Sequence, residues 1–213
     1  MRRPCTTWIY PSCRWPRRCI GEFMTPADGL REIYIQPGES HLATEPVILR
    51  TLLGSCVAVA FLAAERGVGA LCHPMLPTCP SRLKSAPNWM PAQRYVDFAI
   101  RDLAERYAAL GIARKDVTIK VFGGADVLQV AKDSSRATVG KLNCETALRV
   151  LREEGFSVAA SSLGGTSGLT LQFNTLTGEV LVRRLNSVRA GEGAGCTATH
   201  LQRRRKTVEA SAR

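Results

Sequence analysis

The stretch that decides the fold runs from Leu49 to Pro77 and reads LRTLLGSCVAVAFLAAERGVGALCHPMLP. Two apolar runs, 57–62 and 68–72, flank a short polar segment that ends in Gly67. Two β-rich runs joined by a short turn that contains glycine predict a β-hairpin. A turn centred on Ala64 and Glu65 would place Cys56 directly opposite His73, because facing residues of an antiparallel pair share one side of the sheet.

A thiol beside an imidazole can perform nucleophilic catalysis. The thiolate is the attacking form of cysteine, and a neighbouring imidazole lowers the thiol pKa and takes its proton. Gly54 leaves room for a substrate, and backbone N–H groups near Cys56 are candidate donors to an oxyanion. The alternative is structural, because a lone cysteine in an apolar strand is commonly a small buried hydrophobe. His73, which precedes Pro74, could equally end a strand.

The rest of the chain predicts a single α+β domain of layered mixed β-sheets with two main helices packed outside. Alternation and turn signals predict further strands over residues 30–36, 47–53, 117–122, 156–160, 169–173 and 180–185. Helical spacing predicts the helices Pro91–Leu110 and Val139–Glu154, the second capped by Thr138. We expect a disordered basic leader over 1–29, a folded domain over 30–185 and a disordered basic tail over 186–213. Translation beginning at Met24 is an alternative start.

Composition narrows the classes of function. The chain has 213 residues, enough for one domain with a full core, and a net charge of +11. Arg and Lys concentrate towards the two ends, which argues against a nucleic-acid-binding fold and against a nucleic-acid partner. No run of apolar residues is long enough for a membrane span, so no membrane insertion is expected.

Cysteine usage points to a reducing compartment. Eight cysteines are present without a CxxC pair, so we expect free thiols in the cytoplasm. Cys72, His73 and Cys79 could be considered zinc ligands, but neighbouring residues on a strand point to opposite faces and no second cluster completes the site. We therefore expect neither a metal nor an organic cofactor.

Several motifs in order resemble the chemoreceptor glutamine deamidase family CheD. The resemblance covers roughly residues 30–185 and combines several segments of the chain. They are YIQPGE at 34–39, TLLGSCVAV at 51–59, GVGALCHPMLP at 67–77, KVFGGA at 120–125, VGKLN at 139–143, and the glycines near 164–168 followed by TGEV at 177–180.

The resemblance implies a site and a function. Cys56 would be the nucleophile, His73 the base and Thr51 the third member, although a spacing one residue longer would put Arg50 in the place of Thr51. The implied reaction converts glutamines on the cytoplasmic helices of methyl-accepting chemotaxis receptors to glutamate through a thioester. The phosphatase CheC is an implied partner. A largely non-catalytic adaptor that binds receptors or CheC is the alternative.

Overall fold

The computed structural model describes residues 29–81, 90–127 and 137–185. The expected leader, apart from Gly29, and the expected tail lie outside the described residues. Residues 82–89 lie outside them as well. In the part of the chain that is described, no helix has the length and apolar character needed to cross a membrane.

The described strands form two sheets. The four-stranded sheet has the order β1-β3-β8-β9, with bounds Arg31–Tyr34, Val47–Leu53, Leu169–Asn174 and Val180–Arg184. The five-stranded sheet has the order β2-β5-β4-β6-β7, with bounds Ser40–Ala43, Val68–Cys72, Val57–Ala63, Thr118–Gly123 and Val158–Leu163. Both sheets mix parallel and antiparallel pairs.

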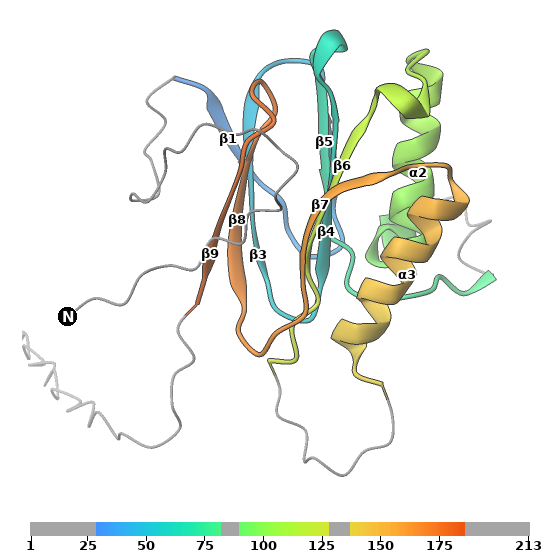
Figure 1. Ribbon diagram of the computed structural model, residues 1–213, viewed down its shortest axis with the longest axis vertical. Coiled ribbons are helices and arrows are strands. Elements are labelled where there is room, and N and C mark those ends of the chain that lie inside the picture. The colour runs from blue at the N-terminus through green and yellow to red at the C-terminus, as the bar shows by residue number, and fades with distance from the viewer. Residues whose placement is uncertain (1–28, 82–89, 128–136, 186–213) are drawn as a thin grey trace, which may run out of the picture.

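The two sheets and two helices make three layers (Figure 1). The sheets pack face to face, and helices α2 (Val96–Ala109) and α3 (Val139–Glu153) cover the other face of the five-stranded sheet. The predicted α+β class with two helices outside layered sheets is therefore confirmed.

Strand β4 lies in the middle of the molecule, and all seven of its residues are buried. Val57, Val59 and Phe61 belong to the apolar cluster under the helices. Ala58, Ala60 and Leu62 belong to the cluster between the sheets. A strand covered on both faces needs a continuous apolar run, which is why VAVAFLA carries no polar alternation.

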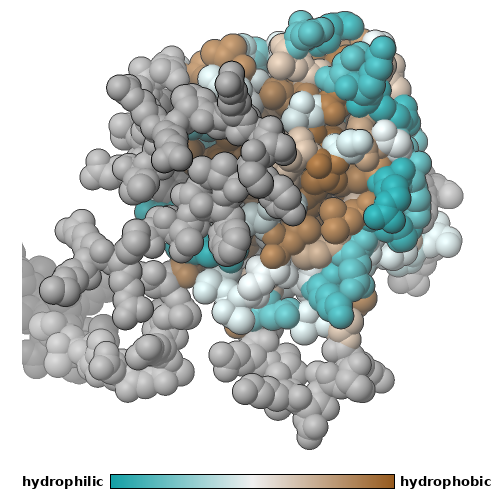
Figure 2. Space-filling model, in the orientation of Figure 1, coloured by the Kyte–Doolittle hydropathy of each residue, from teal (hydrophilic) through white to brown (hydrophobic). Residues whose placement is uncertain are grey.

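The helices are held to the sheet by apolar packing and to each other by ion pairs. Tyr107 of α2 is 1% exposed, and its hydroxyl donates to the carbonyl oxygens of Phe61 and Val68. Arg101 of α2 pairs with Glu153 of α3 at 2.7 Å and with Glu154 at 3.2 Å. Hydrophilic side chains accordingly gather on the helical side of the molecule, on the right in Figure 2.

Most predicted elements form, with shifted ends. The predicted first helix begins as a 3₁₀ turn, Met90–Arg94, and becomes α-helical only at Val96. Thr138 caps α3 as predicted, accepting a hydrogen bond from the N–H of Lys141 at 3.3 Å. Strand β2 was not predicted. His41 therefore lies in a strand, where it pairs with Leu71, and not in a loop.

The predicted hairpin forms, but its predicted register is wrong. Ala63 faces Val68 and Val59 faces Cys72, so Cys56 does not lie opposite His73 on the ladder. The turn is two residues longer towards the C-terminus than expected, because Ala63 faces Val68 instead of Arg66 and the 3₁₀ turn Ala64–Arg66 is closed by Gly67 at φ 63°. Each residue's partner consequently moves by two positions. An even shift keeps every side chain on its face, so the expected sharing of a face survives.

Candidate active site

Thr51 and His73 meet between the two sheets. Thr51 lies on β3 and His73 directly follows β5, and each is 1% exposed. The Thr51 Oγ1 atom lies 2.7 Å from His73 Nδ1 and 2.8 Å from the carbonyl oxygen of Ile35. The residue that touches the imidazole is therefore Thr51. Arg50, which the longer spacing would select, pairs instead with Glu32 at 2.7 Å.

These contacts assign the tautomer of His73. The threonine hydroxyl has one proton, and the Ile35 carbonyl can only accept it. Oγ1 is then the acceptor for Nδ1–H, which also lies 3.4 Å from the Ile35 oxygen. The hydrogen-bond network thus puts the ring proton on Nδ1 and leaves Nε2 with its lone pair.

The environment of His73 keeps this ring neutral. Burial lowers the pKa of His73 from its usual 6.5, and the smaller opposing influences of the Ile35 carbonyl and the Glu39 carboxylate do not reverse the direction. Nε2 is buried, and no described residue forms a hydrogen bond with it. A neutral imidazole with an unused lone pair has the chemistry required of a general base.

Cys56 lies immediately before β4 and packs, half-buried, against the cluster between the sheets. The N–H of Val57, the next residue, donates to the carbonyl oxygen of Pro74 at 3.3 Å. This bond joins the segment that carries Cys56 to the segment that carries His73. No hydrogen bond links the Cys56 sulfur to Nε2 in this structure.

Burial raises the pKa of the Cys56 thiol, an effect that the thiol's own backbone N–H only partly opposes. This direction is opposite to the lowering that an adjacent imidazole was expected to produce. With the His73 pKa lowered as well, the resting site holds a thiol and a neutral imidazole, not an ion pair. Attack by sulfur therefore requires transfer of its proton to a base as the reaction begins.

The backbone around Cys56 is held from one side. The carbonyl oxygens of Gly54 and Cys56 accept hydrogen bonds from the N–H groups of Ala125 at 2.9 Å and Gly124 at 2.7 Å. The Ser55 carbonyl accepts from the Asn143 side chain at 2.9 Å. Within the described residues, the N–H of Cys56 donates to no other residue. An unused amide N–H beside a thiol is the kind of group that can donate to an oxyanion.

Sequence reasoning missed Asn143, Gly124 and Ala125 as parts of the site. The KVFGGA motif covers the end of β6 and the glycine after it, and the VGKLN motif begins α3. What the motifs do not reveal is that both converge on the loop before Cys56. The available signal was their co-occurrence with the Cys56 and His73 motifs in one family pattern.

The zinc alternative does not fit the geometry. Cys72 is fully buried in the cluster under the helices, on the face opposite to His73. Its thiol donates to the Val59 carbonyl, and burial raises its pKa to about 12. The described residues contain no group of three or more His, Cys, Asp or Glu side chains placed to hold a metal ion.

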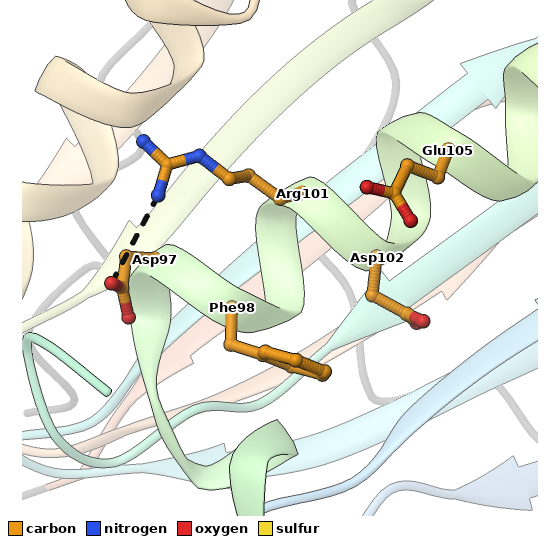
Figure 3. Close-up of a pocket in the computed structure, with 5 residues that line it drawn as sticks. All are labelled: Asp97, Phe98, Arg101, Asp102 and Glu105. Carbon is orange, nitrogen blue, oxygen red and sulfur yellow. Dashed lines mark ion pairs between the residues drawn. The ribbon is translucent and has the colours of Figure 1, made fainter. Parts of the chain in front are cut away.

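A hollow of about 190 Å³ on the outer side of α2 is separate from these residues (Figure 3). It is lined by Asp97, Phe98, Arg101, Asp102 and Glu105, all from one helix. Its acidic groups are largely engaged, because Asp97 accepts from the Cys79 N–H and Asp102 pairs with Arg106 at 2.9 Å. The hollow contains none of the groups needed for the chemistry above.

Comparison with known proteins identifies the class to which this fold and site belong. The family model described as "CheD chemotactic sensory transduction" matches residues 75–184. The chain belongs to the CheD family.

Individual relatives agree over most of the chain. A Geobacter sulfurreducens protein named "Probable chemoreceptor glutamine deamidase CheD 2" is 40% identical over 161 residues, covering 76% of this chain and 94% of the relative. A Trichlorobacter lovleyi protein named "Probable chemoreceptor glutamine deamidase CheD" is 34% identical, covering 76% and 96%. The solved structure of Bacillus licheniformis hypothetical protein YfiH covers 58% of this chain and 49% of its own, at 13% identity and a TM-score of 0.39, too distant to bear on function.

Proposed function

We propose that this protein hydrolyses the side-chain amide of specific glutamines in methyl-accepting chemotaxis receptors, converting them to glutamate. Membership in the CheD family and the names of its relatives support the substrate class. The observation that carries the chemistry is the free lone pair on His73 Nε2, which Thr51 fixes through Nδ1. The proposed substrate is a cytoplasmic receptor helix, so we also propose that the protein acts in the cytoplasm.

The reaction begins with proton transfer. Nε2 of His73 takes the proton of the Cys56 thiol while the sulfur forms a bond to the glutamine Cδ. The carbonyl oxygen becomes an oxyanion, to which the Cys56 N–H donates. The imidazolium is stabilised by Nδ1–H donation to Thr51 and by the nearby Glu39 carboxylate. The charge of Glu39 favours the protonated ring, although burial keeps the His73 pKa below its usual value.

The second half restores the enzyme. His73 returns its proton to the departing nitrogen, the C–N bond breaks, and ammonia leaves a thioester on Cys56. His73 then takes a proton from water as the hydroxide adds to the thioester carbon. The C–S bond breaks, the sulfur regains its proton, and the product is a glutamate side chain. These steps use only Cys56, His73, water and the substrate.

The partner phosphatase CheC is a further proposal that stands on the family resemblance. Co-purification of the full chain with CheC tests it, and absence of a stable complex would reject it. The alternative role, a non-catalytic adaptor, is less well supported, because receptor binding alone needs no buried base with an unused lone pair.

Chemical reactivity of Cys56 tests the enzyme proposal independently of the receptor. Cys144 is the matched control, since it is also half-buried with a thiol pKa raised by burial. Its thiol lies 3.8 Å and 4.0 Å from the carbonyl oxygens of Gly123 and Gly124. Iodoacetamide followed by peptide mapping should modify Cys56 faster than Cys144, and His73→Ala should abolish the difference. Equal rates in the wild-type protein would favour the adaptor.

A further inference from the structure

Asn143 of α3 connects the two segments that carry the proposed nucleophile and base. Its side chain is 0% exposed, and its Nδ2 donates to the carbonyl oxygens of Ser55 and Met75, both at 2.9 Å. Ser55 directly precedes Cys56, and Met75 lies two residues after His73. An asparagine amide has two N–H donors, so one side chain satisfies both carbonyls.

The position of Asn143 is set by close backbone packing. A Cβ atom on Gly140, one helical turn earlier, would lie 2.6 Å from the carbonyl oxygen of Gly124. Helix α3 can therefore rest directly on the turn after β6 only because this residue is glycine. That turn also provides the N–H groups that bind the carbonyls of Gly54 and Cys56. The carbonyl oxygens of residues 54–56 are thus held by α3 and the turn after β6.

The oxygen of the Asn143 side-chain amide indicates a role beyond stability. Among the described residues, its buried Oδ1 atom has no hydrogen-bond partner. A buried acceptor left unpaired costs free energy. Local choices that oppose stability occur at sites where function fixes the residue.

We propose that Asn143 is a positioning residue that fixes the separation and orientation of Cys56 and His73. This inference rests on the proposed function. Among the three carbonyls held around Cys56, only that of Ser55 depends on a side chain. Loss of Asn143 therefore releases one attachment of the nucleophile loop and one of the segment that follows the base. A displacement of about 1 Å between reacting groups lowers rates by roughly a hundredfold.

The variants Asn143→Ala and Asn143→Asp test the proposal. Alanine removes both donors, whereas aspartate keeps the volume and turns acceptor oxygens towards the two carbonyls. Each should lower kcat for receptor deamidation by about tenfold or more while KM changes little. Each should also lower the iodoacetamide rate of Cys56 towards that of His73→Ala, without changing the rate of Cys144.

Thr175→Ala is the matched structural control. Thr175 is 3% exposed and also makes two buried hydrogen bonds, to the N–H and the carbonyl of Val47, at the far end of β3 from the site. It should lower the melting temperature while leaving kcat and Cys56 alkylation within about twofold of wild type. If both Asn143 variants lower the melting temperature as Thr175→Ala does but keep kcat and Cys56 alkylation, the positioning role is wrong.

The two readouts separate this inference from the proposed function. If wild-type protein deamidates no receptor glutamine but Asn143→Asp still slows Cys56 alkylation, the positioning role stands and the proposed function fails. If wild-type protein is an active deamidase and Asn143→Asp is equally active and equally alkylated, the proposed function stands and the positioning role fails. In both cases Asn143→Ala gives the same test where Asn143→Asp, with a buried carboxylate facing two carbonyl oxygens, does not fold.

Discussion

Replacing Thr51 by valine should disable the base while leaving the shape of the core nearly unchanged. Valine matches threonine in volume but lacks the Oγ1 atom that lies 2.7 Å from His73 Nδ1 and 2.8 Å from the Ile35 carbonyl. The ring could then move its proton to Nε2, the atom that must accept the thiol proton. Two buried polar groups would also lose their close partner, at a cost of about 1–3 kcal/mol.

The magnitude follows from these lost contacts. If the free energy of the lost contacts appears in the transition state, kcat falls by roughly tenfold to a hundredfold, since about 1.4 kcal/mol corresponds to tenfold. The same loss should lower the melting temperature by about 2–10 °C for a domain of this size. Thr51→Ser keeps the hydroxyl and should recover most of the rate.

Two measurements check this prediction. Receptor deamidation by Thr51→Val and Thr51→Ser is measured at a temperature where both remain folded. Nitrogen NMR of the histidine ring reports the tautomer directly, and in wild-type protein the proton should be found on Nδ1 of His73. The reasoning would be refuted if Thr51→Val kept the kcat of the wild-type protein, or if the ring proton of His73 in the wild-type protein were found on Nε2.

Three further outcomes follow from the same geometry. Because burial lowers the His73 pKa below 6.5, kcat/KM should stay constant as pH falls from neutral to 6.5 and decrease only below it; a decline centred above 6.5 would contradict this. The unfolded chain binds a proton at His73 more readily than the folded chain does, because burial lowers the pKa of the folded state. The free energy of unfolding should therefore include the contribution of the neutral ring above pH 6.5 and lose it as pH falls through the folded-state pKa. Chemical denaturation at several pH values measures this free energy. His41→Ala should keep full deamidase activity, because His41 pairs on β2 with Leu71 at the opposite side of β5 from β4; a substantial loss of kcat would assign His41 an unexpected role.

The sequence was sufficient for the layered architecture because β4 is apolar at every position. Seven consecutive buried residues leave no doubt that the strand is covered on both faces. The register was predicted wrongly because the sequence AAERG, residues 63–67, does not by itself fix how many residues form the turn. Gly67, the only residue there with a left-handed backbone, marks the last position of the turn and was the available signal.

Strand β2 could not be predicted from its own residues. Ser40, His41, Leu42 and Ala43 include no β-branched or aromatic side chain, and they become a strand by pairing with the edge of β5. The same limit applies to Asn143. Its neighbours indicate a helix, but its two hydrogen bonds reach residues 88 and 68 positions earlier in the chain. Thr51 could be proposed from its motif, but only the fold brings it to His73.

The predicted pairing of Cys56 with His73 assumed a register that the structure corrects. The predicted contact across the ladder does not exist, and a hydrogen bond between Val57 and Pro74 instead links the segments that carry the two residues. Side-chain alternation, which survives a shift of two, placed both on the inner face.

Mass spectrometry of a receptor cytoplasmic fragment tests the central claim most directly. The fragment is incubated with wild-type protein, with Cys56→Ala, or alone, and its glutamine-containing peptides are compared. Wild-type protein should add about 1 Da at particular glutamines, the mass change of amide-to-acid hydrolysis, and Cys56→Ala should add none. An unchanged fragment with wild-type protein, or an equal gain with Cys56→Ala, would contradict the account.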